Sequence, residues 1–333
     1  MTEKSEKKIL LTGVAGFIGS HLLSRALKEG YRIVGVDNFL TGKMSNIEAV
    51  LNENPEYPER FELLREDIRD LDKMIDAAAG CACIIHEAAI GSVPWSIQDP
   101  LLAHHTNMTG FIHILEAAKA NKIKRVVYAS SSAVFGDATA VPAKENAEGH
   151  CLSPYASSKR SQEIYAEAYA RCYHLEIIGL RYFNVFGKRQ DPNGAYAAVI
   201  PKWGAAMAES RPCVIFGDGT STRDYCHVDN VVQANFLAMN MPSSSKEGFA
   251  YAMNIGCGRE TSLLELHQMM KSAFEQKYSK SVHDPKFESP RLGDIEHSCA
   301  DISQAERVLG FKPLISVKDG LASLILSGEF DII

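Results

Sequence analysis

Short apolar runs alternate with amphipathic stretches along the first half of the chain. The apolar runs predict buried β-strands at 8–12, 31–36, 60–66, 83–86, 125–129 and 175–180. Between the first two of these runs, residues 20–29 carry apolar side chains at helical spacing, and Gly30 follows them. Because strands that alternate with helices form parallel sheets covered on both faces, this half predicts an α/β fold with a doubly wound parallel sheet.

The hydrophobic pattern becomes irregular after Asn184. We therefore expect residues 1–184 to form the larger unit and residues 185–333 to form mainly a smaller, mixed α/β lobe assembled from separate segments. We also expect the two lobes to interleave, with later segments returning to the first unit.

The composition is that of an ordinary globular protein and argues against several classes of function. The 333 residues are 46% hydrophobic and 23% charged, with a net charge of −6. Without a Lys/Arg-rich block we expect no nucleic-acid partner, and without an apolar run of ~18 residues we expect no membrane span. The start has no signal-peptide pattern and the eight cysteines are scattered, so we expect a cytoplasmic protein without a disulfide framework or a metal site.

A glycine-rich turn follows the first predicted strand. Gly13, Gly16 and Gly19 allow a tight turn, a close approach of the backbone to a diphosphate, and packing of the next helix on the strand. That helix would direct its N–H groups and the positive end of its dipole at the phosphates. Asp37 ends the second predicted strand, where a carboxylate suits the ribose 2′-hydroxyl of NAD and repels a 2′-phosphate. The pattern therefore predicts NAD as the cofactor.

A tyrosine and a lysine stand four residues apart later in the same half. Ser153 and Pro154 predict the start of a helix that carries Tyr155 and Lys159 on one face. A free tyrosine has a pKa near ~10 and is a poor base at neutral pH, but a neighbouring ammonium group lowers that pKa. The pair is a candidate general acid/base that moves a proton on and off a hydroxyl group.

The two motifs together resemble the short-chain dehydrogenase/reductase superfamily, in particular its extended branch that acts on nucleotide sugars. The glycine pattern is G-x-x-G-x-x-G, and Tyr-x-x-x-Lys follows it. The resemblance implies a Rossmann-like sheet that binds NAD and a smaller lobe that binds a UDP-sugar. It implies that the cofactor contacts Gly13, Gly16, Phe17, Ile18, Gly19, Asp37, Asn38, Asp67, Ile68, Ala88, Asn107, Tyr155, Lys159 and Phe183.

A serine run after the fifth predicted strand narrows the reaction that the resemblance implies. In the nucleotide-sugar branch, a Ser or Thr at the position of Ser131 binds the substrate 4-hydroxyl beside the tyrosine, and Ser132 supplies a second hydroxyl. Dehydratases and decarboxylases of this branch carry acids at the next two positions, where this chain has Ser132 and Ala133. The implied reaction is therefore 4-epimerisation, in which Tyr155 removes and returns the hydroxyl proton while NAD accepts and returns the hydride.

Three further segments, 89–94, 189–196 and 291–298, are similar to bacterial and archaeal UDP-N-acetylglucosamine 4-epimerases. Ser298 stands where epimerases restricted to non-acetylated sugars carry a tyrosine, and its smaller side chain leaves room for a 2-acetamido group. Trp95 departs from the resemblance, because relatives often carry an arginine there, and it argues weakly against a charged sugar. The implied activity is the interconversion of UDP-N-acetylglucosamine and UDP-N-acetylgalactosamine, with UDP-glucose and UDP-galactose as candidate further substrates.

Two arginines are expected to hold the diphosphate of the substrate. A guanidinium group matches phosphate in bidentate geometry, which favours Arg223 and Arg291, with Asp224 and Asp294 as their natural partners. The substrate residues that the resemblance implies are Gly91, Ser92, Ser131, Ser132, Asn184, Gln190, Ala198, Val199, Val214, Phe216, Arg223, Arg291 and Ser298.

Two alternative functions stay open at this point. The first is a 4-epimerase of UDP-hexuronic acids, derived from UDP-glucose or UDP-N-acetylglucosamine. The second is a non-catalytic NAD-binding sensor, which the presence of Ser131, Tyr155 and Lys159 disfavours. The resemblance also implies a homodimer, in which helices at 106–119 and 156–173 of each subunit form a four-helix interface.

Overall fold

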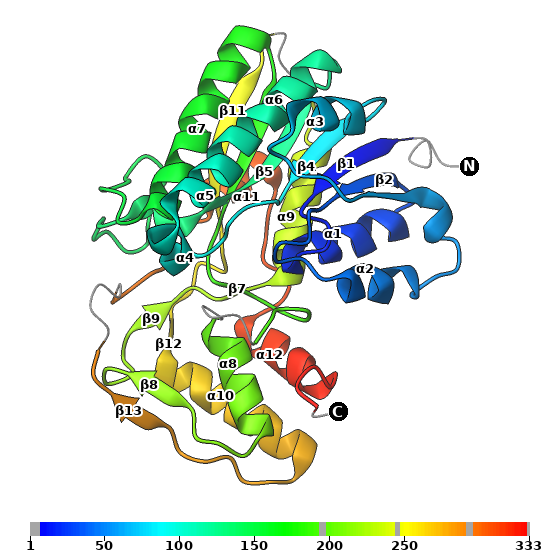
Figure 1. Cartoon of the computed structure of the whole chain (residues 1–333). Helices are drawn as coiled ribbons and strands as arrows, with labels where there is room; N and C mark the ends of the chain where they lie inside the picture. The colour runs from blue at the N-terminus through cyan, green and yellow to red at the C-terminus, as the bar shows by residue number, and fades with distance from the viewer. Residues whose placement is uncertain (1–6, 193–197, 244–246, 291–295, 332–333) are drawn as a thin grey trace.

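The computed structural model describes residues 7–192, 198–243, 247–290 and 296–331, and it shows two lobes (Figure 1). The upper lobe in Figure 1 is built on a seven-stranded sheet, and the lower lobe holds shorter strands and the helices α8, α10 and α12. Within the described ranges, no helix is both long and apolar enough to cross a membrane.

The seven-stranded sheet is entirely parallel and has the order β11-β6-β5-β4-β1-β2-β3. Its strands are β1 (Lys8–Thr12), β2 (Arg32–Val36), β3 (Phe61–Leu64), β4 (Cys83–His86), β5 (Arg125–Ser131), β6 (Glu176–Tyr182) and β11 (Phe249–Ile255). The six predicted strands are confirmed to within two residues, whereas β11 was not predicted. The strand order reverses between β1 and β4, and the crevice at the carboxyl ends of the strands there is where open α/β sheets bind ligands.

Helices cover both faces of the sheet because successive strand residues point to opposite sides. Leu10 of β1 packs with one layer, and Ile9 and Leu11 pack with the other. The first layer holds α3 (Leu71–Ala77), α6 (Gly110–Ala120) and α7 (Pro154–Tyr173). The second layer holds α1 (Phe17–Lys28), α2 (Met44–Leu51), α9 (Val228–Asn240) and α11 (Ser303–Leu309).

The smaller lobe has a hydrophobic core of its own. Trp203, Leu266, Phe274 and Leu321 are buried there, on α8 (Val199–Ala208), α10 (Leu263–Tyr278) and α12 (Val317–Leu326). Short strand pairs complete this half of the chain: β7 (Val185–Phe186) with β10 (Cys226–His227), β8 (Val214–Phe216) with β13 (Lys286–Glu288), and β9 (Thr222–Arg223) with β12 (Thr261–Ser262). Because α9, β11 and α11 pack on the large sheet, the segment after residue 184 contributes to both lobes.

A buried ion pair fixes the later segments to the sheet. Arg125 on β5 donates through Nη2 and Nε to Glu176 on β6, at 2.6 and 3.0 Å, and both side chains are less than a tenth exposed. The same guanidinium donates to the carbonyls of Ala238 and Met241, at 2.6 and 2.9 Å, where α9 ends. Arg125 therefore joins two strands and the helix that crosses them.

Replacing this arginine should destabilise the fold. We expect Arg125→Leu to lower the free energy of unfolding by about 3–5 kcal/mol, because the Glu176 carboxylate is left buried without its partner. Denaturant titration followed by circular dichroism measures the loss. The matched control, Arg211→Leu, removes an exposed pair with Glu209 and should cost no more than about 1 kcal/mol. Equal losses in the two variants would contradict the role of the buried pair.

Candidate active site

A cavity of about 620 Å³ opens at the carboxyl ends of the central strands of the large sheet. It brings together residues from widely separated positions in the sequence. The predicted residues that line it are Gly13, Gly16, Phe17, Ile18, Gly19, Asp37, Asn38, Ile68, Ala88, Gly91, Ser92, Ser131, Ser132, Tyr155, Lys159 and Asn184.

The glycine turn leaves no room for side chains. A Cβ added to Gly13, whose φ is +70°, would lie 2.7 Å from the backbone nitrogen of Ala88. A Cβ added to Gly19 would lie 2.0 Å from the carbonyl oxygen of Gly13. The helix α1 begins directly after Gly16 without a side-chain cap or an acidic residue in its first turn. Its first N–H groups and the positive end of its dipole therefore suit an anionic group in the cavity.

Two carboxylates shape the next part of the cavity wall. Asp37 accepts the N–H of Ala15 at 2.9 Å and the N–H of Phe39 at 2.8 Å, and burial raises its pKa. The remaining lone pairs of Asp37 can accept hydrogen bonds from the hydroxyl groups of a ligand in the cavity. Asp67 lies on the far side of Asn38 from the cavity and accepts a hydrogen bond from Nδ2 of Asn38 at 2.9 Å. Hydrogen bonds from Arg69 lower the pKa of Asp67 to about 2. Asp67 thus orients Asn38 instead of lining the cavity itself.

These features fit NAD. The glycine turn matches a diphosphate that lies against bare backbone, and the Asp37 carboxylate matches a ribose with free hydroxyl groups. When bound there, NAD supplies a hydride acceptor for the chemistry of the site.

The predicted tyrosine helix is present, and it holds the proton-transfer groups. Ser153 caps α7 by accepting the N–H of Ala156 at 3.1 Å, with Pro154 in the first turn. Lys159 Nζ donates to the carbonyl of Ala129 at 2.7 Å, which fixes the ammonium group at the end of β5. Ser131, also at the end of β5, lines the same cavity and lies close enough to the Tyr155 hydroxyl to lower its pKa. Helix and strand thus converge on one point of the cavity.

The expected low pKa of Tyr155 is wrong for this structure, because its pKa is raised overall. Burial raises the pKa of Tyr155 above its usual value, and the hydrogen bond from Ser131 offsets only part of that effect. Burial also lowers the pKa of Lys159, to about 8. The low dielectric of the cavity disfavours the charged form of both groups. The spacing of the two residues in the sequence does not show that they are buried.

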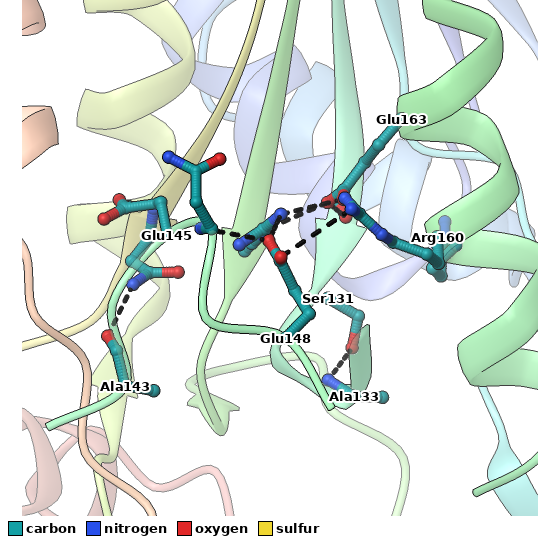
Figure 2. Close-up of polar contacts among 12 residues, drawn as sticks. Ser131, Ala133, Ala143, Glu145, Glu148, Arg160 and Glu163 are labelled. Atoms are coloured by element: carbon teal, nitrogen blue, oxygen red, sulfur yellow. Dashed lines mark hydrogen bonds and ion pairs between the residues drawn. The ribbon is translucent and has the colours of Figure 1, made fainter. Parts of the chain in front are cut away.

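A buried ionic network lies beside Ser131 (Figure 2). Glu163 lies one turn beyond Lys159 on α7. Its carboxylate accepts hydrogen bonds from Ser130 Oγ at 2.7 Å and from Arg181 Nε at 2.8 Å. Arg160 also donates to Glu163, at 2.8 Å, and Arg181 pairs in addition with Glu148 on the loop before α7. The network joins α7, β5, β6 and this loop directly beside Ser131.

Besides Asp67, two more predicted cofactor residues do not line the cavity. Asn107 sits in a π-helical turn at His105–Thr109 and holds the backbone of Ile90 through two hydrogen bonds, at 2.8 and 3.2 Å. It shapes the cavity wall from behind, since Ile90 lines the cavity. Phe183 is buried against Phe135 with ring centroids 6.0 Å apart, so the structure places its side chain in the core, away from the cavity.

A second cavity of about 680 Å³ adjoins the first. It is lined by the predicted substrate residues Gln190, Ala198, Val199, Val214, Phe216 and Arg223. Asn184 and Val185 line both cavities, so the two meet where β6 passes into β7. An elongated ligand in the second cavity can therefore direct one end towards Ser131 and Tyr155.

The expected pairing of Arg223 with Asp224 is wrong. The Asp224 carboxylate is buried and accepts backbone N–H groups from Cys257 at 2.7 Å, Gly258 at 2.9 Å and Ala300 at 3.1 Å. It joins three chain segments, and its neighbours Arg223 and Tyr225 line the second cavity. Arg223 donates instead to the carbonyl of Thr222 at 2.8 Å, and its side chain lines the cavity.

The remaining substrate predictions lie in or beside a part of the chain that is not described. Arg291 and Asp294 are outside the described residues. Ser298 is partly exposed, and its N–H donates to the carbonyl of Thr222 at 3.2 Å. The residues that line the two cavities do not include Ser298 within the described ranges.

Glu87 and Tyr182 are among the site residues that the sequence analysis missed. Glu87 directly follows β4 and lines the first cavity, as does Tyr182 at the end of β6. The Tyr182 hydroxyl donates a hydrogen bond to Glu87 Oε1 at 2.7 Å and accepts one from Asn235 Nδ2 at 2.7 Å. The available signal was an acidic residue at the carboxyl end of a buried parallel strand.

Comparisons with known proteins agree with this geometry. The model of the NAD dependent epimerase/dehydratase family matches residues 9–256. A UDP-glucose 4-epimerase of Mycolicibacterium smegmatis is 36% identical over 96% of this chain and 97% of its own length. The structure of a UDP-N-acetylglucosamine 4-epimerase from Methanobrevibacter ruminantium M1, in complex with UDP-N-acetylmuramic acid, has a TM-score of 0.86 at 35% identity, covering 96% of this chain and 97% of its own. A UDP-glucuronic acid 4-epimerase from Bacillus cereus, in complex with UDP-glucuronic acid and NAD, has a TM-score of 0.81 at 33% identity, covering 96% and 98%.

The glycine turn generates a prediction about cofactor binding. We expect Gly19→Ala to weaken NAD binding by about tenfold to hundredfold, equivalent to 1–3 kcal/mol of overpacking, because the new methyl group meets the Gly13 carbonyl. Isothermal titration calorimetry with NAD measures the change. The control is Gly91→Ala in the same cavity, where an added Cβ meets nothing within 4 Å and the affinity should be retained. If Gly19→Ala binds NAD with the wild-type dissociation constant, the glycine turn does not hold the diphosphate.

Proposed function

The chain belongs to the NAD dependent epimerase/dehydratase family, and we propose that this NAD-dependent UDP-sugar 4-epimerase interconverts UDP-N-acetylglucosamine and UDP-N-acetylgalactosamine. The observation that carries the proposal is the convergence of Ser131, Tyr155 and Lys159 in the first cavity, which adjoins the second at Asn184 and Val185. One cavity fits NAD, and the other is large enough for a nucleotide. The cytoplasmic location expected from the sequence belongs to the same proposal.

The side chains of the site perform proton transfer and placement. The Tyr155 hydroxyl, bridged by Ser131, removes the proton of the sugar 4-hydroxyl as a base and later returns it as an acid. Lys159, fixed on the Ala129 carbonyl, favours the phenolate whenever its ammonium group is charged. Ser132 and Ala133 offer no acid for elimination, so the carbon skeleton keeps its hydroxyl groups. What remains is inversion at the carbon that carries the 4-hydroxyl.

The charges around the cavity favour a neutral sugar over a hexuronic acid. Among the described residues that line the first cavity, the acidic side chains are Asp37, Glu66 and Glu87, and the cation is Lys159. Beside Tyr155, a sugar carboxylate would find the Lys159 cation already opposed by Glu87. Trp95 lines the same cavity at the position where relatives often carry an arginine. The alternative of a UDP-hexuronic acid 4-epimerase is therefore less well supported.

The choice of an acetylated sugar rests on Ser298 and on one structural relative. Ser298 has the short side chain that leaves room for a 2-acetamido group. Within the described ranges, it does not line either cavity. The 35% identical structure of a UDP-N-acetylglucosamine 4-epimerase supports the same choice. The non-catalytic sensor is disfavoured, because its site would have no need of the assembled Ser131, Tyr155 and Lys159.

We further propose that two copies of the chain form a homodimer through α6 and α7. Tyr165 and Tyr173 on α7 are 43% and 45% exposed, and the Tyr169 hydroxyl between them donates to Glu116 of α6 at 2.7 Å. Exposed tyrosines on a helix pair are typical of interface cores. A twofold axis beside these helices would place the same face of each subunit against the other and form a four-helix interface.

A panel of UDP-sugars tests the proposed substrate. Incubated without added reductant and followed by NMR, the enzyme should convert UDP-N-acetylglucosamine to the galacto isomer faster than UDP-glucose or either hexuronic acid. Tyr155→Phe should lose about 10²–10⁴-fold of the rate, because it lacks the proton-transfer group. A panel in which only a hexuronic acid reacts would replace the proposal with its alternative.

The variant Ser298→Tyr in the same panel tests the acetamido argument. We expect it to suppress turnover of the acetylated sugar by about tenfold or more, while UDP-glucose is retained, since the ring would fill the space of the acetamido group. An equal loss on both sugars would show that Ser298 does not discriminate between them.

The proposed dimer face is tested by a charge. We expect Tyr165→Glu to shift the molar mass measured by light scattering from two chains to one, because two acidic groups would be buried near the twofold axis. The control is Leu314→Glu, an equally drastic change at a 74% exposed site outside both helices, and it should leave the mass at two chains. A wild-type protein with the molar mass of one chain would refute the proposed dimer.

A further inference from the structure

Glu87 is an ionisable group of the active-site cavity to which the reaction described above gives no role. It follows β4 and lines the same cavity as Tyr155 and Lys159. Its carboxylate is held in place, because Oε1 accepts the hydroxyl of Tyr182 at 2.7 Å and Asn235 in turn donates to that hydroxyl at 2.7 Å. A rigidly placed carboxylate beside the proton-transfer pair acts on it through charge.

The ionisable groups around Glu87 come from several elements. Tyr155 and Lys159 face it from α7, and Tyr182 contacts it from β6. Glu163 and His86 also interact with Lys159, and Cys226 on β10 interacts with Tyr182. The Lys159 ammonium interacts with the Glu87 carboxylate and stands one turn along α7 from Tyr155, so a Glu87 carboxylate and a Tyr155 phenolate would both be anions near the same cation.

We propose that Glu87 is a positioning residue that balances the charge of Lys159 and competes with Tyr155 for it. With Glu87 ionised, Lys159 is paired and Tyr155 keeps its proton. With Glu87 protonated, the same net charge is reached by a Tyr155 phenolate opposite the ammonium group. Moving one proton between Glu87 and Tyr155 therefore leaves the net charge of the cavity unchanged, which a site of low dielectric favours.

The titration behaviour of the three groups agrees with this arrangement. Burial raises the pKa of Glu87 to about 7, against the opposing effects of the Tyr182 hydrogen bond and the Lys159 charge. Burial lowers the pKa of Lys159 to about 8, and the charge of Glu87 counteracts that change. The charge of Glu87 also adds to the burial that raises the pKa of Tyr155. Glu87 therefore changes charge in the pH range in which the enzyme needs both phenolate and phenol.

The variant Glu87→Gln tests the proposal, because its amide oxygen still accepts the Tyr182 hydroxyl while the charge is gone. Without the negative charge, the pKa of Tyr155 falls, and the acid limb of the pH profile of kcat/KM moves to lower pH. The pKa of Lys159 falls as well, so the basic limb moves in the same direction. We expect both limbs to shift by about one pH unit, the size of a typical effect of a nearby charge.

A matched variant separates charge from structure. Tyr182→Phe removes the hydrogen bond and keeps the carboxylate, which then ionises at a higher pH, so its profile should shift less than that of Glu87→Gln and in the same direction. If Glu87 served only to hold Tyr182, Tyr182→Phe would lower the rate and Glu87→Gln would not shift either limb. A Glu87→Gln profile with both limbs at their wild-type positions overturns the proposal, whatever its height.

A second measurement does not depend on the substrate, although the proposal rests on the proposed function of Tyr155 and Lys159. The ultraviolet absorbance of tyrosinate is titrated in the NAD-loaded enzyme, and the same titration of Tyr155→Phe is subtracted to isolate Tyr155. In the Glu87→Gln background, the pKa isolated in this way should be about one unit lower. An unchanged pKa refutes the charge role of Glu87, whereas inactivity on every UDP-sugar would refute only the proposed function.

Discussion

The geometry of the site depends on one buried carboxylate, that of Glu163. It accepts hydrogen bonds from Ser130 on β5, Arg181 on β6 and Arg160 on its own helix, all between 2.7 and 2.8 Å (Figure 2). Glu163 and Arg181 are each 2% exposed, and such a pair is worth most when every partner is present. Removing Glu163 or Arg181 would leave the other side chain buried with fewer partners for its charge.

The consequence of this network is a fixed distance between helix and strand. Lys159 lies one turn and Tyr155 two turns before Glu163 on α7, and Ser131 directly follows Ser130 on β5. Anchoring Glu163 on Ser130 therefore sets how closely the tyrosine hydroxyl can approach Ser131. The loop before α7 is tied to the same elements, since Glu148 pairs with Arg181 and Glu145 accepts the N–H of Asn254 on β11 (Figure 2). Preorganisation of this kind makes proton transfer effective.

The sequence predicts what depends on neighbouring residues and misses what depends on distant ones. The strands and the glycine turn follow from local patterns, and the structure has them within two residues of the predicted bounds. The strand β11 was missed because it joins the sheet from a segment whose pattern is irregular. Asp224 was assigned a neighbouring arginine, whereas the structure gives it three N–H groups from segments more than 30 residues away. Such partners leave no periodic signal in the chain.

The tyrosine–lysine spacing shows how far a motif determines chemistry. Spacing places Tyr155 and Lys159 on one face of a helix, and their pKa values then follow from burial, from Ser131 and from Glu87. A buried site disfavours every isolated charge, so the phenolate forms most readily when the net charge of its surroundings does not change. Lys159 alone cannot satisfy this condition while the Glu87 carboxylate opposes it. The proton affinity of Tyr155 is therefore a property of the whole cavity, with Glu87 as the group that the motif leaves out.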